Sequence, residues 1–552
     1  MRLKSRLNRG LLSGGLVALT AISPAAAQDI GKSPAASASS KTIEQKHDEA
    51  VAADIAAGWA TAPVEERETS TAHRIVAHGR TMKYHSTAGT LTLRDDNGKP
   101  VASIFYVAYT LDGAARDNRR PITFFYNGGP GSSSIWLHMG SFAPMRVQTA
   151  GPETIKPAPY AFGPNPDTLL DQTDMVFVDA PGTGFSRALG DAKPKDFWGV
   201  DQDVDAFAKA IMRYVSKNGR WNTPKFLFGE SYGTTRSAAL AYALQDRGMA
   251  LNGVILLSSI LNYGVEQPGY DIGDIAYLPS FATTAWYHHK LANPPADVAE
   301  VAAQARAFAR GPYTAALARG QTLSPQETDQ IANRMSALTG LSADFIKKAN
   351  LRVSLARFQK ELLRDQRLTV GRFDSRYTGI DSDAAGERPE TDASDTAISG
   401  AFIATFRDYL TNTLGYRTEM PYQVAAYDLK GFDWDWKHKA PNSRWDQQMP
   451  DVALDLAAAM RANPYLKVLS LNGYYDMATP FFGTEYDLDH MMLEPQQQQN
   501  IEFRYYPSGH MVYLNPDALH MLHRDLADFY NRAVNEAAAG RPPVPPSMSS
   551  AR

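Results

Sequence analysis

The strongest chemical signal in this chain is Ser231, which stands between Gly229 and Gly233. A serine hydroxyl becomes a useful nucleophile at the tip of a sharp strand-to-helix turn, where the strained backbone needs neighbours without bulk. Residues 225–228 before the serine, a lysine followed by three apolar residues, are typical of a buried strand end, and residues 235–244 after it are typical of a helix. This arrangement predicts a nucleophile elbow. The five residues alone leave a glycine-flanked surface turn as an alternative.

A nucleophilic serine needs a base to accept its proton and a carboxylate to orient that base. Asp476 follows the apolar run 466–471, and His510 follows the run 501–506. Both residues are therefore expected in loops at the carboxyl ends of strands, where open α/β folds gather their ligands. Taken singly, Asp476 is an ordinary turn residue and His510 an ordinary loop histidine. The order serine, aspartate, histidine after three strands predicts a catalytic triad.

A glycine-rich loop at 126–134 follows the first buried run of the chain, 122–126. Glycines allow backbone N–H groups to approach a ligand closely, as an oxyanion hole requires. A phosphate cradle is the alternative for such a loop, but the Gly-Lys-Ser/Thr ending and any dinucleotide spacing are missing. The loop therefore favours stabilisation of a developing oxyanion.

The elements that must position these residues follow an α/β pattern. Short buried runs are separated by helical segments, of which 200–215 is the clearest, and this predicts a mostly parallel sheet covered by helices on both faces. Before it, Asn97 and Gly98 between two alternating runs predict a hairpin. Residues 262–455 break the rhythm, and the capping box that begins at Ser324 predicts helices there. The aromatic run 432–436 either covers the cleft entrance or forms part of the core of this insertion.

With these motifs, the chain resembles the serine carboxypeptidases. The matching stretches are residues 127–131 with the serines that follow, 178–186, the elbow with Glu230, the Asp476 loop, and 508–512. The resemblance implies an α/β-hydrolase fold with a central, mostly parallel sheet flanked by helices and a helical cap insertion. It also implies an enzyme that releases C-terminal amino acids from peptides with a free C-terminus.

The resemblance assigns roles to individual residues. Ser231 is implied as the nucleophile, His510 as general base and then acid, and Asp476 as the group that orients it. The remaining implied roles belong to the oxyanion hole, with Gly129 and Tyr232, and to the site for the substrate carboxylate, with Asn127, Gly128 and Glu230. A glutamate that binds a carboxylate must be protonated, so burial or a nearby negative charge must raise its pKa.

One departure from the family concerns this carboxylate site. Ser141 stands where the family commonly has a second glutamate, so the carboxyl pair that shares a proton is missing. Arg146 is close in sequence and is a candidate for direct charge pairing with the substrate. The missing glutamate keeps open an esterase or an amidase on small substrates. An acyltransferase, which would use the same intermediate but exclude water, and a non-catalytic binding protein on the same scaffold are further alternatives.

The composition excludes several other classes. The formal net charge of −3 gives no reason to expect a nucleic-acid partner, and the absence of cysteine rules out thiol catalysis. No cofactor is expected. Two histidine-containing clusters, His520 with His523 and His490 with two aspartates, lack further ligands at a recognisable spacing, so no metal site is expected.

The N-terminus has the three regions of a cleavable export signal: a basic start, an apolar stretch at 11–22 and small residues at 25–27. No later segment is apolar for long enough to span a bilayer. We expect an exported protein, periplasmic or secreted and of bacterial type. The predicted divisions are a signal peptide at 1–27, a mobile segment at 28–70, the first part of the hydrolase core at 71–261, a mainly helical cap insertion at 262–455, the second part of the core at 456–539 and a disordered tail at 540–552.

Overall fold

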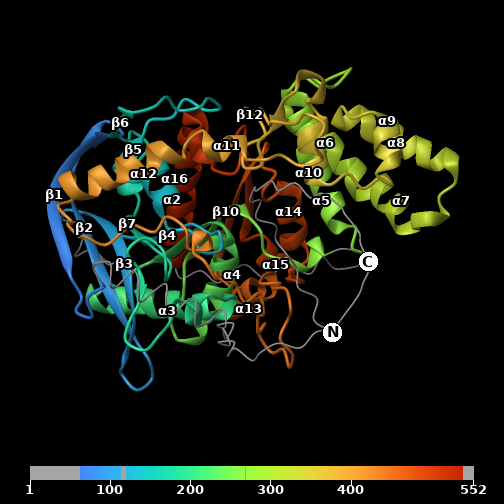
Figure 1. The fold of residues 1–552 in the computed structure, drawn as a ribbon. Helices are drawn as coiled ribbons and strands as arrows, with labels where there is room; N and C mark the ends of the chain where they lie inside the picture. The colour runs from blue at the N-terminus through green and yellow to red at the C-terminus, as the bar shows by residue number, and fades with distance from the viewer. Residues whose placement is uncertain (1–61, 114–119, 268, 539–552) are drawn as a thin grey trace, which may run out of the picture.

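The computed structural model describes residues 62–113, 120–267 and 269–538 of the chain (Figure 1). The predicted signal peptide at 1–27 and the predicted tail at 540–552 lie outside the described residues, as does most of the segment predicted to be mobile. The first strand begins at Glu68, within the last three residues of that segment.

A mixed sheet forms the centre of the molecule (Figure 1). Its order is β1-β2-β3-β7-β4-β9-β10-β13-β14, and the short β8 pairs with β3. The strands β1 to β3 are antiparallel, β7 is antiparallel to β3, and from β7 to β14 all neighbours are parallel. The strand bounds are β1 Glu68–Ala77, β2 Arg80–Arg94, β3 Pro100–Leu111, β4 Ile122–Tyr126, β7 Asp174–Val178, β8 Arg187–Ala188, β9 Lys225–Ser231, β10 Gly253–Ser259, β13 Lys467–Gly473 and β14 Ile501–Tyr506. The mostly parallel sheet predicted from the buried runs is confirmed.

Each face of the sheet has its own apolar core, because successive side chains of a strand point to opposite faces. Phe124 belongs to one core and Phe125 to the other. One face is covered by α3 (Val200–Lys217), α4 (Tyr232–Asp246) and α13 (Ala453–Ala462). The other is covered by α2 (Ile135–Gly140), α12 (Ser399–Asp408) and α16 (Pro516–Ala538). Helices on both faces were predicted, and together with the parallel strands they give an α/β-hydrolase fold.

The helices α5 to α10 form a separate group beside the sheet (Figure 1). They enclose a third apolar core together with residues of α14. The Ser324 capping box is present: its hydroxyl accepts the N–H of Glu327, and the Glu327 carboxylate accepts the N–H of Ser324. The bounds are α5 Ile272–Tyr287, α6 Val298–Phe308, α7 Thr314–Arg319, α8 Pro325–Thr339, α9 Ala343–Lys348, α10 Leu355–Glu361 and α14 Phe481–Asp489.

The later part of the predicted insertion returns to the core. The helix α12 packs against α2, and α13 begins at Ala453, so it lies on the core before the predicted end of the insertion at 455. A segment at residues 423–438, called the strap below, forms backbone bridges with the glycine-rich loop and with Gly184 and Gly199. The remaining short elements are β5 Met145–Val147, β6 Phe162–Pro164, β11 Thr369–Val370, β12 Thr378–Gly379, α11 Ala393–Thr396 and α15 Pro495–Gln498.

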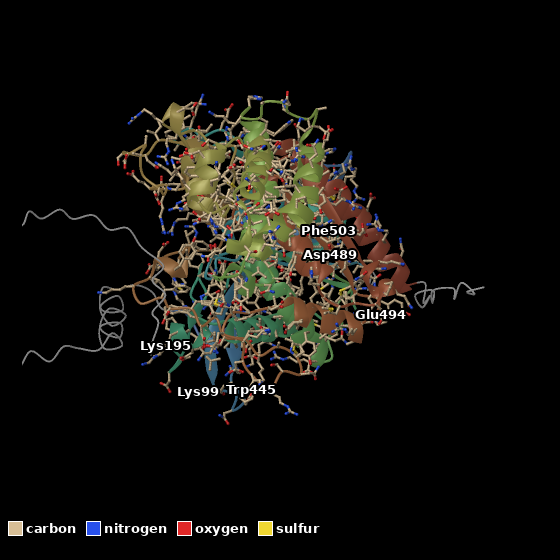
Figure 2. The ribbon with its side chains drawn as sticks, turned by 90° about the vertical axis from the view of Figure 1, so that its right-hand side faces the viewer. Lys99, Lys195, Trp445, Asp489, Glu494 and Phe503 are labelled. Atoms are coloured by element: carbon tan, nitrogen blue, oxygen red, sulfur yellow. The ribbon has the colours of Figure 1, made fainter. Side chains whose placement is uncertain are left out.

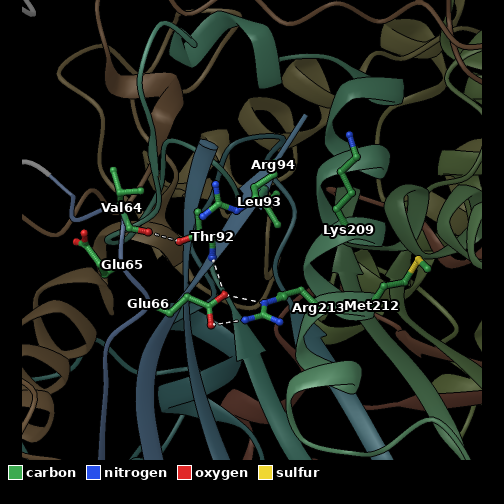
Figure 3. Close-up of a pocket in the computed structure, with 9 residues that line it drawn as sticks. All are labelled: Val64, Glu65, Glu66, Thr92, Leu93, Arg94, Lys209, Met212 and Arg213. Carbon is green, nitrogen blue, oxygen red and sulfur yellow. Dashed lines mark hydrogen bonds and ion pairs between the residues drawn. The ribbon is translucent and has the colours of Figure 1, made fainter. Parts of the chain in front are cut away.

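The N-terminal segment is tied to the edge of the core by Glu66 (Figure 3). Its carboxylate accepts two hydrogen bonds from Arg213 of α3, at 2.8 and 3.0 Å, and one from the backbone of Thr92 in β2 at 3.1 Å. A surface hollow of about 750 Å³ lies here, and no predicted site residue lines it. Within the described ranges, no helix is long and apolar enough to cross a membrane.

Candidate functional site

Ser231 occupies the strained turn that the sequence predicted. It is the last residue of β9 and immediately precedes α4, and its backbone has φ 60° and ψ −132°. Such a conformation costs a non-glycine residue about 1–3 kcal/mol. The flanking glycines are required sterically, since a Cβ on Gly229 would lie 2.1 Å from the carbonyl oxygen of Gly233 and a Cβ on Gly233 would lie 2.8 Å from that of Tyr126. The hydroxyl is therefore held on the kind of turn that presents a nucleophile.

Asp476 and His510 meet in the loops that follow β13 and β14. The Nδ1 atom of His510 lies 2.8 Å from Oδ2 of Asp476, and both side chains are buried. The Asp476 carboxylate also accepts the backbone N–H groups of Ala478 and Thr479, at 2.7 and 3.0 Å, and the Thr479 hydroxyl at 2.8 Å. Thr479 was not predicted, although it belongs to the same loop as Asp476. These bonds keep the aspartate aimed at the imidazole ring.

The strand β10 brings the histidine loop toward the serine. Ser231 pairs in register with Ser259 of β10. The hydroxyl of the preceding residue, Ser258, donates a hydrogen bond of 2.6 Å to the backbone carbonyl of His510. Serine and histidine loops far apart in the sequence are thus joined through one central strand.

The glycine-rich loop lies against the start of α4. A Cβ on Gly128 would lie 2.3 Å from the backbone nitrogen of Tyr232, so only glycine allows this approach. The next residue, Gly129, has φ 108°. Arg236 of α4 holds the loop by donating a 2.8 Å hydrogen bond to the carbonyl of Asn127. The two predicted oxyanion donors, Gly129 and Tyr232, therefore come from segments in direct contact.

Glu230 is buried beside the predicted triad. Burial, reinforced by the charge of Asp476, raises the pKa of Glu230 to about 7, although the charge of His510 and the polar groups of Tyr513 and Asn127 act in the opposite direction. Among the described residues, neither Oε2 of Glu230 nor the hydroxyl of Tyr513 meets strict hydrogen-bond geometry, although Tyr513, Glu230 and Asn127 lie close enough for their polar groups to act on one another. A carboxyl group, a phenol and an amide thus gather in one buried place.

The same charges act on His510. Burial alone would lower the pKa of His510, but the charge and hydrogen bond of Asp476, with the charge of Glu230, outweigh it and raise the pKa. A histidine of increased basicity is a better proton acceptor for a serine hydroxyl, provided that it is neutral at the working pH.

The carboxylate-binding residues differ from the sequence-based hypothesis in one respect. Ser141 is buried and donates its hydroxyl to the carbonyl of Leu137 at 2.5 Å, so it does not replace the missing carboxyl group. Arg146, the candidate for direct charge pairing, is also buried. It donates to the backbone carbonyls of Gly140 and Tyr513, at 3.2 and 3.3 Å, and to the Thr149 hydroxyl at 2.9 Å. These bonds give Arg146 a structural role behind the site.

The strap covers the elbow with aromatic residues. The rings of Trp434 and Trp436 meet the Tyr232 ring edge-on, at centroid distances of 5.3 and 6.2 Å. The aromatic run was predicted either to cover the cleft entrance or to belong to the core of the insertion. Its contact with the elbow favours the first of these. The strap is anchored at His438, whose ring nitrogens lie 2.6 Å from Asp201 and 2.8 Å from Asp455. Burial would lower the pKa of His438, but these hydrogen bonds raise it to about 9.

One histidine cluster differs from the sequence analysis. His523 lies beside Asp171 and His78 rather than acting with His520, and within the described part of the chain the three ligand atoms lie within 4.8 Å of one another. The two imidazole rings are stacked at 4.1 Å, with planes 15° apart. A zinc ion bound at 2.0–2.1 Å must lie near the plane of each ring, which stacked rings do not permit. The cluster is therefore a stacked histidine pair, in which His523 bonds Asp171 and His78 bonds the carbonyl of Thr168.

In the other cluster, His490 with two aspartates, each side chain has a different partner. His490 interacts with the carbonyl of Tyr486 at 2.7 Å, and Asp489 lies at the surface (Figure 2), where it is 3.7 Å from Arg310. Asp487 is buried and accepts the backbone N–H of Leu261 at 3.3 Å. These partners point in different directions, and the three side chains do not converge.

The sheet order, the strained serine turn and the loops at the carboxyl ends of the strands define an α/β hydrolase. Residues 79–291 match the family described as serine carboxypeptidase, so the resemblance predicted from the motifs is confirmed over this segment. Asp476 and His510 lie beyond the matched residues.

Similar proteins carry several names. A region of 209 residues is 28% identical to "P-(S)-hydroxymandelonitrile lyase" of Sorghum bicolor, covering 37% of this chain and 36% of that protein. A region of 176 residues is 24% identical to "Serine carboxypeptidase-like 36" of Arabidopsis thaliana, covering 31% of this chain and 34% of that protein. The chain thus spans little more than a third of the length of these relatives.

Among solved structures, the chain is similar to Kex1, described as a prohormone-processing carboxypeptidase from Saccharomyces cerevisiae. The identity is 14% and the TM-score is 0.47, with 82% of this chain and 91% of that chain covered.

Proposed function

We propose that this protein is a serine-type carboxypeptidase that releases C-terminal amino acids from peptides through an acyl-enzyme on Ser231. Buried Glu230 is the observation that carries the proposal beyond a general hydrolase. Its pKa of about 7 keeps a large share of the group protonated at neutral pH, and the polar groups of Tyr513 and Asn127 lie beside it. A neutral carboxyl group can donate a hydrogen bond to the terminal carboxylate of a peptide, whereas an ionised one repels it.

The proposed reaction uses these groups in the following order. His510, oriented by Asp476 at 2.8 Å, removes the proton of the Ser231 hydroxyl as the oxygen attacks the last peptide carbonyl. The N–H groups of Gly129 and Tyr232 stabilise the oxyanion. His510 then protonates the leaving amine, and the C-terminal amino acid departs. Water, deprotonated by His510, attacks the acyl-enzyme and regenerates the serine.

Binding of the substrate carboxylate is assigned to Glu230 with its neighbours. Asn127 and Gly128 line the same loop, and the Asn127 side-chain oxygen is already used by the N–H of Leu137 at 3.0 Å. The amide nitrogen of Asn127 is therefore the atom of this side chain that we assign to hydrogen bonding with the substrate carboxylate. The hydroxyl of Tyr513, which the sequence did not predict and which lies beside Glu230 and Asn127, adds a second donor.

The first test is covalent labelling of the purified protein with a fluorophosphonate. Labelling that disappears in Ser231→Ala supports an enzyme with an activated serine. If the wild-type protein is not labelled while a control serine hydrolase is, the scaffold is a binding protein and the proposal fails.

The second test separates a carboxypeptidase from the other activities of this scaffold. Paired peptides that differ only in a free or amidated C-terminus are incubated with the enzyme, and the released amino acid is quantified. The proposal expects release from the free form and a kcat/KM at least about 10-fold lower for the amide. Equal hydrolysis of both forms, or hydrolysis of small esters alone, favours an esterase or amidase, an alternative that Ser141 supports because it leaves Glu230 without a second carboxyl group.

We also propose that the protein works outside the cytoplasm, in the periplasm or the medium of a bacterium. The three-part N-terminal pattern of residues 1–27 and the absence of cysteine from the sequence support this location. Cell fractionation of a chain tagged at its C-terminus, with the mature N-terminus determined by mass spectrometry, tests it. Retention of residues 1–27 on a cytoplasmic protein would refute it.

A further inference from the structure

A loop of the insertion touches both residues of the predicted acid–base pair. The backbone N–H of His510 donates a 2.6 Å hydrogen bond to the carbonyl of Phe373, and the N–H of Met477, next to Asp476, donates a 3.1 Å bond to the carbonyl of Arg372. The residue pair 372–373 is therefore fixed at the rim of the site, although it is more than a hundred residues from each catalytic group in the sequence.

The loop is also held from behind. The Asp392 carboxylate accepts the backbone N–H groups of Arg372 and Phe373, at 3.1 and 3.2 Å, and the Ser394 hydroxyl accepts the N–H of Asp374 at 3.2 Å. The main chain at Arg372 thus has bonds on both sides. A side-chain substitution at this position removes none of these bonds.

The Arg372 side chain itself is exposed. Its guanidinium lies 5.2 Å from the centroid of the Phe373 ring, and that ring lies 5.2 Å from the His510 ring. The guanidinium contacts this ring, and it forms no hydrogen bond or ion pair with any of the described residues. By contrast, nearby Arg376 is buried and donates to both carboxylate oxygens of Asp374, at 2.9 and 2.6 Å. Arg372 therefore presents a cation with unused donors beside the catalytic histidine.

The site as described has no other cation for a substrate anion. Arg146 donates inward to backbone and Thr149 groups, and Glu230 offers a hydrogen bond without a positive charge. The guanidinium of an arginine matches a carboxylate in shape and can form two parallel hydrogen bonds with it. The charge of Arg372 also reaches His510: burial and Arg372 lower the pKa of the imidazole, while Asp476 and Glu230 raise it.

We infer that Arg372 forms a subsite for a carboxylate of the substrate, either the C-terminal carboxylate or an acidic side chain next to the cleaved bond. This inference rests on the proposed function and deepens it by naming a specificity-determining residue from the insertion. Such a subsite makes the enzyme selective for substrates that carry a negative charge near His510.

The test compares Arg372→Gln and Arg372→Lys with wild type on four blocked dipeptides. These end in leucine or glutamate, each with a free or an amidated C-terminus. Arg372→Gln is expected to lower kcat/KM for substrates that carry the recognised carboxylate by about 10–100-fold. Arg372→Lys keeps the charge but loses the paired geometry, so it restores part of the loss. Arg334→Gln, at an exposed arginine of α8, is the matched control and leaves kcat/KM unchanged.

The substrate pairs identify the source of the carboxylate. A loss confined to free C-termini, with leucine and glutamate affected alike, assigns the subsite to the terminal carboxylate. A loss confined to glutamate, with free and amidated forms affected alike, assigns it to the side chain. A second readout is the acidic limb of kcat/KM on an uncharged ester, which moves to higher pH in Arg372→Gln because a positive charge near His510 is removed.

Two results overturn the inference: an equal change for all four substrates, or no change for any of them with an unshifted acidic limb. Failure of the proposed function in favour of an esterase is distinguishable, because fluorophosphonate labelling then stays intact while no dipeptide is hydrolysed. In that case an aryl ester with a carboxylate and its methyl ester replace the dipeptides, and an equal Arg372→Gln effect on both overturns the inference.

Discussion

The protonation of Glu230 makes a prediction that can be measured as stability. The ordinary pKa of the group is 4.5, and burial raises it to about 7 in the folded protein. Below pH 4.5 the carboxyl group is protonated in both states. Between pH 4.5 and 7 the unfolded chain releases the proton while the folded protein retains it, so the free energy of unfolding decreases as the pH rises. The difference of about 2.5 between the two pKa values corresponds to about 3 kcal/mol.

Glu230→Gln removes this titration while keeping the shape and the hydrogen-bonding groups. We expect the free energy of unfolding of the variant, relative to wild type, to increase by up to about 3 kcal/mol between pH 4 and pH 8. Urea unfolding at several pH values, followed by fluorescence, measures the difference. Glu65→Gln, at an exposed glutamate of the N-terminal segment, is the control and should show no such trend. A difference between Glu230→Gln and wild type that stays constant with pH would refute the assigned protonation.

The same substitution affects the alkaline side of the activity profile. In wild type, ionisation of Glu230 near pH 7 places a negative charge against the substrate carboxylate, so kcat/KM for free C-termini decreases above this pH. The amide of Glu230→Gln cannot ionise, and the decrease should be absent. An alkaline limb of equal position in both proteins contradicts the role of Glu230 in carboxylate binding.

Three further predictions concern the surrounding structure. Asp476→Asn should lower kcat by about 10³–10⁴-fold with little change in KM, because the imidazole loses its orienting acceptor; an unchanged kcat refutes the triad. Gly128→Ala should reduce the rate of fluorophosphonate labelling by at least about 10²-fold, since the new Cβ meets the Tyr232 nitrogen, whereas Gly311→Ala, in open space, should not. His438→Gln should remove up to about 3 kcal/mol of stability that wild type has below pH 6.5 and loses as the pH rises through about 9, so urea unfolding curves of the two proteins should converge at high pH.

Much of the fold could be predicted because most of the parallel strands contain a short apolar run. The observed β4, β7, β9, β10 and β13 coincide with such runs, and β14 coincides with the strand predicted at 501–506, which alternates apolar and charged residues before two tyrosines. The strand β1 was missed, because it lies at the edge of the sheet and alternates between exposed and half-buried residues for most of its length. Few of its side chains are apolar. Its partner β2 begins several residues before 90–93, the run that precedes Asn97 and Gly98 in the predicted hairpin.

The residues of the candidate site also fall into those that a local motif indicates and those whose position depends on the fold. Ser231, Asp476 and His510 could be proposed from the sequence because each follows a recognisable strand and belongs to a local motif. Tyr513 and Arg372 could not be proposed from the sequence, since their positions depend on which distant loop folds against them. Arg146 illustrates the converse: its distance along the chain from the glycine-rich loop is short, but its side chain turns inward to backbone carbonyls.

The position of β13 and β14 at one edge of the sheet has a consequence for biosynthesis. A nascent polypeptide that has reached residue 475 already contains the serine turn and the whole insertion, yet it has neither the carboxylate nor the imidazole of the proposed triad. These groups arrive only when the last two strands add beside β10. If the proposed triad is correct, the order of the strands keeps the serine inactive until both late loops have been synthesised and folded.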